Sequence, residues 1–220
     1  MTTYPVRQGI TTFEEFLEIA PDGQKADLLD GVIYMASPDN TDAADLNLWL
    51  AILLYTFVDS NDLGKIYTSR VAYRLGPKQG PEPDIGFVPK ELEFTRRRGY
   101  IDGPPTLAVE IVSPDSVARD YVQKRAVYES AGVREYWIID PDEKQATFLT
   151  LRGDRYVTVK PKNHIFSSQV LPGFRIDVRW LWKTPRPRPH DVLRWMSGEE
   201  KIPLRFSKRQ RRKEKRNSRH

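Results

Sequence analysis

Two carboxylates occupy segments whose other residues are typical of buried strands. Asp84 begins the apolar part of the run PEPDIGFV, after two prolines, and Glu110 lies in the run TLAVEIV. If side chains alternate along each strand, both carboxylates lie on a face that carries few other polar groups. An ionised carboxylate in such a place is paired, protonated or bound to a cation, because burial without a partner is strongly unfavourable. We therefore expect Asp84 and Glu110 to share a partner.

A lysine is the third unusual residue. The predicted helical face that faces the sheet consists of Val117, Tyr121, Lys124 and Tyr128. A lysine on such a face needs a carboxylate or a phosphate to meet its ammonium group. Two carboxylates and a lysine suit phosphodiester hydrolysis, in which Mg²⁺ or Mn²⁺ binds the carboxylates and the lysine orients the attacking water or offsets developing charge.

Each of these residues also has a purely structural interpretation. Asp84 is suited to capping a turn after Pro83, and Glu110 to a structural ion pair with Lys124. Asp27, next to an Asp-Gly turn, is as typical of an ordinary hairpin as of a site. A lysine taken alone is more often a surface residue. Only the joint pattern of the three favours chemistry.

Periodicity and turn residues predict the elements that must position these side chains. In chain order they are a helix at 12–20, a hairpin at 27–35 turned at Asp30-Gly31, a helix at 41–57, strands at 65–75 and 84–88, a polar loop at 90–105, strands at 106–112 and 135–140 around a helix at 115–131, and a hairpin turned at 152–154 with short β segments after it. A strand, a helix and a strand joined in this way are usually parallel neighbours, so the centre of the protein is predicted to be α/β.

Composition separates the chain into a body and a tail. Residues 201–220 hold ten Lys or Arg and one acid, whereas residues 1–200 hold 25 basic and 29 acidic residues. The body is thus acidic, which suits a site that gathers divalent cations, and the basic tail is predicted to be disordered and to act as a solvated terminus or a phosphate-binding arm. Cysteine is absent, which excludes disulfides, thiolate nucleophiles and Cys-based zinc sites.

The size of the chain suits one domain with extensions. We predict a body over 1–183, a Pro/Arg-rich linker with a short helix over 184–200, and the basic tail over 201–220. The N-terminus lacks a basic start followed by an apolar core, and no run approaches the roughly 18 apolar residues of a membrane span. We therefore expect a soluble cytoplasmic protein with no membrane partner.

Four segments carry a resemblance to a known family. They are DLLDGVIYMASP, EPDIGFV, LAVEIVSPDS and DYVQKRAVYESAGVREYWIID. In this order they resemble the Uma-two family of restriction-endonuclease-like proteins, within the PD-(D/E)XK nuclease superfamily, over roughly residues 10–160. The resemblance implies a restriction-endonuclease-like core, with a mixed central sheet flanked by helices and here a C-terminal β extension. It also implies DNA cleavage that depends on a divalent metal.

The resemblance assigns roles to individual residues. Asp84 and Glu110 match the metal-binding acids, and the backbone carbonyl of Ile111 is a further expected ligand of Mg²⁺ or Mn²⁺. Val112 stands where the superfamily usually has its lysine, which points to Lys124 as a relocated lysine. Asp27 stands where relatives usually have a glutamate of the site. The implied partner is DNA, although RNA fits the same pattern, and cleavage of two strands implies a homodimer. The alternative is a catalytically inactive nucleic-acid-binding or scaffold protein with the same fold.

Overall fold

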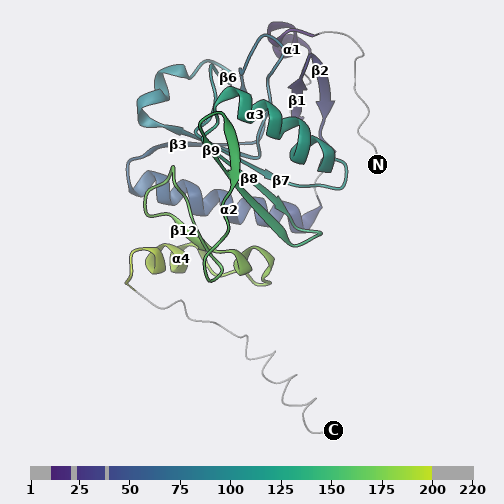
Figure 1. Ribbon diagram of the computed structural model, residues 1–220. Coiled ribbons are helices and arrows are strands. Elements are labelled where there is room, and N and C mark those ends of the chain that lie inside the picture. The colour runs from purple at the N-terminus through teal and green to yellow at the C-terminus, as the bar shows by residue number, and fades with distance from the viewer. Residues whose placement is uncertain (1–10, 21–23, 38–39, 200–220) are drawn as a thin grey trace, which may run out of the picture.

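A six-stranded mixed sheet forms the centre of the protein (Figure 1). The computed structural model describes residues 11–20, 24–37 and 40–199. The strand order is β10-β9-β8-β7-β5-β3. Their bounds are β3 Gly64–Thr68, β5 Ile85–Pro89, β7 Leu107–Ile111, β8 Glu135–Asp140, β9 Gln145–Arg152 and β10 Arg155–Thr158. Within this sheet, β7 and β8 pair in parallel and the other neighbours are antiparallel.

The helical connection between β7 and β8 lies over one face of the sheet. It contains a π-helical stretch, η2 at Arg119–Lys124, followed by α3 at Arg125–Ala131. This arrangement confirms the predicted strand, helix, strand unit and the mixed sheet flanked by helices. It corrects the predicted helical face, because Val117 is 45% exposed while Lys124 and Tyr128 are buried. In a π-helical turn each hydrogen bond spans five residues instead of four. The face that contains Lys124, extended back to Val117 at 3.6 residues per turn, is therefore placed on the wrong side of the helix.

The opposite face of the sheet is covered by α2, Thr41–Ser60 (Figure 1). Asn40 caps its N-terminus, where its side chain accepts a hydrogen bond from the Ala43 N–H at 2.8 Å. The apolar stripe of α2 packs against the inward residues of β5, β7 and β8 in the main hydrophobic core. By length and composition alone this helix would suffice to cross a membrane, but its buried stripe makes it a core helix of this fold.

A short helix and a hairpin close one end of the sheet. Helix α1, Phe13–Ile19, begins at Thr12 with the predicted capping box. The hairpin of β1, Ala26–Leu29, and β2, Val32–Met35, turns at Asp30-Gly31, where both residues have positive φ as a two-residue turn requires. The hairpin brings the segment around residues 25–27 to the place where β5 and β7 meet.

The region between β3 and β7 is less regular than its sequence suggested. A single strand over 65–75 was the wrong prediction, because the chain turns at Arg70, with φ of 66°, and continues as β4, Ala72–Tyr73. Strand β4 pairs in parallel with β6, Tyr100–Ile101. The predicted polar loop at 90–105 therefore contains β6 and also the 3₁₀ helix η1, Lys90–Thr95. The hydrophobic pattern of a sequence does not show where a non-glycine residue such as Arg70 adopts left-handed backbone angles.

The C-terminal part adds a small β extension and a helix on the α2 side. It consists of β11 Ile165–Ser167, β12 Arg175–Asp177, the 3₁₀ helix η3 Val178–Trp182 and α4 Pro189–Met196. The Pro/Arg segment before α4 is held to α2, since the Trp49 Nε1–H donates to the Pro187 carbonyl at 2.8 Å. The basic tail at 201–220 lies outside the described residues, so its predicted behaviour stays a prediction.

Candidate functional site

Asp84 and Glu110 face each other across neighbouring antiparallel strands. The register pairs Ile85 with Val109, which sets Asp84, just before β5, opposite Glu110. Both are buried, with 8% and 1% of their surface exposed. The Ile111 backbone N–H donates to Asp84 Oδ2 at 2.7 Å, which fixes that carboxylate against β7. The structure thus brings the two predicted metal-binding acids to the same point on the sheet.

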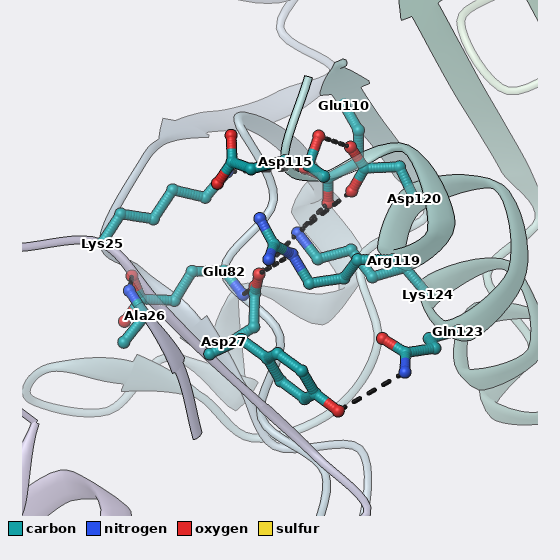
Figure 2. A network of polar contacts seen from close by, with 12 residues as sticks. Lys25, Ala26, Asp27, Glu82, Glu110, Asp115, Arg119, Asp120, Gln123 and Lys124 are labelled. Atoms are coloured by element: carbon teal, nitrogen blue, oxygen red, sulfur yellow. Dashed lines mark hydrogen bonds and ion pairs between the residues drawn. The ribbon is translucent and has the colours of Figure 1, made fainter. Parts of the chain in front are cut away.

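Lys25, which is labelled together with Glu110 in Figure 2, links these two carboxylates from a third segment. Its Nζ lies 2.7 Å from Asp84 Oδ1 and 3.5 Å from Glu110 Oε2. Burial alone would lower the pKa of Lys25, but Asp84 and Glu110 outweigh it and raise this pKa well above its usual value. Lys25 is therefore an ammonium ion at the point where two carboxylates converge. The Lys25 side chain is 18% exposed, whereas the charged side chains around it are 11% exposed or less, namely Asp27, Asp84, Glu110, Asp120 and Lys124.

Lys124 meets Glu110 from the opposite side. Its Nζ lies 2.8 Å from Glu110 Oε1 and 3.0 Å from Asp27 Oδ2, with Asp120 Oδ1 at 3.8 Å. Its side chain is only 1% exposed. Burial favours the neutral amine, yet the carboxylates of Asp27 and Glu110 reverse this and raise the pKa of Lys124. Lys124 is thus held as a buried cation.

Asp27 joins the hairpin to the same group of charges. Its Oδ1 accepts a hydrogen bond from the Glu82 backbone N–H at 2.8 Å, and its Oδ2 lies 3.3 Å from Arg119 Nε as well as near Lys124. Burial acts to raise the pKa of Asp27, but Lys124, Lys25 and Arg119 together lower it. We call the seven residues Lys25, Asp27, Asp84, Glu110, Arg119, Asp120 and Lys124 the ionic network.

Burial raises the pKa of two acids in this region, one within the ionic network and one beside it. Burial raises the pKa of Asp120 to about 7, even though Lys124 acts in the other direction. Burial likewise raises the pKa of Glu82 to about 7, and its carboxylate accepts a hydrogen bond from the Ala26 N–H at 3.1 Å. Burial is also the largest influence on Glu110, whose pKa is raised, and the Tyr128 hydroxyl donates to its Oε1 at 2.9 Å.

The sequence analysis did not identify Lys25, Glu82, Arg119 or Asp120 as members of this region. A signal for three of them was present. Lys25 stands two residues before Asp27, so alternation along β1 directs both side chains to one face of that strand. Asp120 stands four residues before Lys124, which is the spacing of an ion pair on a helix. Glu82 likewise stands two residues before Asp84, although Pro83 lies between them, and Arg119 had no such signal.

The chemistry of the donor set fits a hard divalent cation. Asp84 and Glu110 offer carboxylate oxygens to one shared point, and the Lys25 ammonium at that point is a stand-in for a cation. Within residues 11–20, 24–37 and 40–199, however, no group of three or more His, Cys, Asp or Glu side chains is arranged as a metal site. A third ligand from the described residues would therefore come from a group of another kind, such as a backbone carbonyl or an amide or hydroxyl side chain. The structure records the N–H of Ile111 on Asp84, and the expected role of its carbonyl stays a prediction.

A family model matches most of the chain, over residues 13–179, and its description is "Uma2: Putative restriction endonuclease". The chain belongs to the Uma2 family. The match covers α1 through β12, which includes every residue of the ionic network. The resemblance inferred from the four sequence segments is therefore confirmed. Members of restriction-endonuclease-like families generally use divalent metals, and a nuclease family indicates a nucleic-acid substrate.

A solved structure shares the fold of this Uma2 protein. It is described as a "putative nuclease belonging to DUF820 from Anabaena variabilis ATCC 29413". The match has a TM-score of 0.64 and 16% sequence identity, and it covers 78% of this chain and 97% of the other. At this identity the likeness shows the fold alone, and it confirms the predicted restriction-endonuclease-like core. A comparison with curated proteins found no match.

Proposed function

We propose that the protein is a metal-dependent endonuclease that hydrolyses phosphodiester bonds of DNA. The observation that carries this proposal is the convergence of Asp84 and Glu110 on one cation, the Lys25 ammonium, in a chain of the Uma2 family. A salt bridge alone would need one carboxylate for one lysine. Here the single ammonium of Lys25 contacts two buried carboxylates, and buried charged groups of this kind gather at functional sites more often than elsewhere.

Asp84 and Glu110 would hold Mg²⁺ or Mn²⁺, with the Ile111 carbonyl as a backbone ligand. When bound, the ion would polarise the phosphate and help to activate the attacking water. The chain itself supplies the orientation of both acids. The Ile111 N–H holds Asp84, while Lys124 and the Tyr128 hydroxyl hold Glu110 Oε1 and leave Oε2 directed at the shared point.

Lys124 has a role set by its burial. Because its pKa is raised, it is an ammonium ion and donates hydrogen bonds rather than accepting a proton. Its contacts with Glu110 and Asp27 hold its positive charge against the Glu110 carboxylate, on the side opposite Lys25. In this proposal Lys124 offsets the negative charge that develops on the phosphate, as the sequence led us to expect. Asp27 in turn keeps Lys124 in place from the hairpin side.

Lys25 would leave the carboxylates when the divalent ion binds. Its side chain is partly exposed and has a flexible four-carbon stem, so the released ammonium can turn toward a phosphate bound at the same opening. Lys25 thus joins Asp27, Asp84, Glu110 and Lys124 as a proposed functional residue of the site.

A second candidate is a catalytically inactive nucleic-acid-binding protein that retains the fold. It is favoured by one observation: Lys25 and Lys124 already neutralise the carboxylates, and the described residues contain no group of three side-chain metal ligands. In that case the ionic network would serve only to join the hairpin, β7 and η2.

Incubation with supercoiled plasmid DNA and Mg²⁺ or Mn²⁺ tests the proposal. Wild-type protein and the control Asp62→Asn, an exposed acid paired with Lys90, are expected to nick the plasmid. Asp84→Asn and Lys124→Met are expected to lower the rate by at least about a hundredfold. Nicking that persists in both variants would remove the site assignment. Absence of cleavage by wild-type protein on DNA and RNA of varied sequence would favour the inactive candidate.

A further inference from the structure

A polar cavity of about 460 Å³ lies beside the proposed site. Residues from α1, from the turn between β3 and β4, and from the segment before β6 line it. The polar residues on its wall are Gln24, Ser69, Arg70, Glu82 and Arg98. The proposed function leaves this cavity without a role.

Three covalent or hydrogen-bonded links join the cavity wall to the ionic network. The Ser69 backbone N–H donates to the Asp84 carbonyl at 3.1 Å. Gln24 directly precedes Lys25, and the Glu82 backbone N–H donates to Asp27 Oδ1. Figure 2 shows Glu82 beside Asp27, on the same side of the site as Lys25. A ligand in the cavity would therefore contact segments that are joined directly to Lys25, Asp27 and Asp84.

The charge of the cavity wall is positive. Arg70 and Arg98 are both exposed and both line it. Among the described residues, no acidic side chain forms an ion pair with either arginine. The one acid on the wall, Glu82, accepts a hydrogen bond from the Ala26 N–H through its Oε2. Two arginines over a polar cavity are suited to a phosphate group, which a guanidinium binds through paired N–H donors.

We propose that this cavity holds a backbone phosphate of the nucleic-acid strand, next to the phosphate that is cleaved, with Arg70 and Arg98 as its partners. The inference rests on the proposed function, because it assumes a nucleic-acid substrate at Asp84. Contacts of this kind fix the register and direction of a strand without reading its sequence. The cavity is also large enough to admit the sugar attached to that phosphate.

DNA binding measured without metal tests the inference separately from cleavage. The probe is a short fluorescein-labelled DNA duplex in EDTA, with fluorescence anisotropy recorded over a range of salt concentrations. The test variant is Arg70→Gln/Arg98→Gln. The matched control is Lys160→Gln/Lys162→Gln, which removes the same charge from two exposed residues lining a different cavity near β11.

The arginine variant is expected to bind the duplex at least about tenfold more weakly than wild type. Its plot of log affinity against log salt should be shallower by about 1, because the loss of one phosphate contact removes close to one unit of slope. The lysine control should change the slope by less than about half as much. An arginine variant whose affinity and slope equal those of wild type, or change no more than those of the control, overturns the inference.

A second pair of variants tests the cavity itself. Leu17 lines it and is 41% exposed, so substitutions there are compatible with folding. Leu17→Glu places a carboxylate at the phosphate position and should weaken binding, whereas Leu17→Gln should not. Equal affinity of the two variants contradicts the inference.

The two failures are distinguishable. If Arg70→Gln/Arg98→Gln loses DNA affinity but wild type never nicks DNA, the proposed function fails and the phosphate site stands. If wild type nicks DNA and the arginine variant binds as wild type does, the phosphate site alone fails. Wild-type protein that does not bind the duplex even at low salt overturns both.

Discussion

The ammonium of Lys25 lies 2.7 Å from Oδ1 of Asp84, although 59 residues separate the two in the sequence. The same ammonium lies 3.5 Å from Glu110 Oε2. A cation at this point neutralises two acids that the sheet register forces together. The Lys25 ammonium therefore compensates the buried charges of Asp84 and Glu110. It also occupies the position for which a divalent ion would compete.

Replacement of Lys25 by methionine is expected to strengthen the binding of Mn²⁺. The variant removes the competing ammonium and retains the length of the side chain, so the dissociation constant from calorimetric titration should fall by at least about tenfold. The control is Lys90→Met, which removes an exposed lysine paired with Asp62 and should leave the affinity within about twofold. Mn²⁺ affinity that is equal or weaker in Lys25→Met contradicts the competition.

Replacement of Lys124 by methionine is expected to destabilise the fold as well as to abolish nicking. The change leaves Asp27 and Glu110, both buried, without their shared cation. Loss of one partner from a buried ion pair typically costs about 3–5 kcal/mol of unfolding free energy. Urea denaturation of Lys124→Met and of the exposed control Lys65→Met measures this. An unfolding free energy of Lys124→Met equal to that of wild type would show that the ionic network does not hold Lys124 as described.

Asp120 makes stability depend on pH. Burial raises its pKa to about 7, whereas an aspartate in the unfolded chain titrates near pH 4. The folded protein thus binds this proton more tightly, and the stabilisation is complete below about pH 4 and is lost as the pH rises toward 7. Asp120→Asn stays neutral throughout. Its unfolding free energy relative to wild type should therefore rise between about pH 4 and pH 8, by at most about 4 kcal/mol. Parallel stability curves of the two proteins over this range would contradict the assignment.

Gly86 permits the close approach of Tyr73 to β5. A Cβ atom at Gly86 would lie 2.2 Å from the Tyr73 hydroxyl oxygen and 2.7 Å from its Cζ, and Tyr73 is buried. Gly86→Ala is therefore expected to lower the unfolding free energy by about 1–3 kcal/mol, as overpacking usually does. Gly76→Ala is the matched control, because its Cβ would meet only ordinary contacts at 3.7 and 3.9 Å. Equal melting temperatures for the two variants would contradict this packing.

The sequence predicted the parts of the site that depend on local patterns. Alternation along the two strands gave Asp84 and Glu110 a common face, and connection length gave the parallel pairing of β7 and β8. The position of Lys124 on the sheet-facing side of its helix was also predicted correctly. These features follow from period and spacing, which a single sequence displays.

The remaining parts depend on contacts between distant segments. The register that sets Asp84 opposite Glu110, and the position of the hairpin that brings Lys25 to them, are decided by packing of whole elements. The π-helical turn at η2 also lacks a sequence pattern, and for that reason Val117 was wrongly placed on the buried face. Sequence analysis consequently found both acids and Lys124 but not the cation between the acids.

A crystal structure of the protein soaked with Mn²⁺ tests the central claim most directly. The account predicts an anomalous scattering peak in contact with the carboxylates of both Asp84 and Glu110, with the Lys25 ammonium moved away from them. Crystals of Asp84→Asn, soaked in the same way, should lack that peak. A wild-type map with no peak at this point, and with Lys25 still 2.7 Å from Asp84, would contradict the claim that these two acids form a divalent metal site.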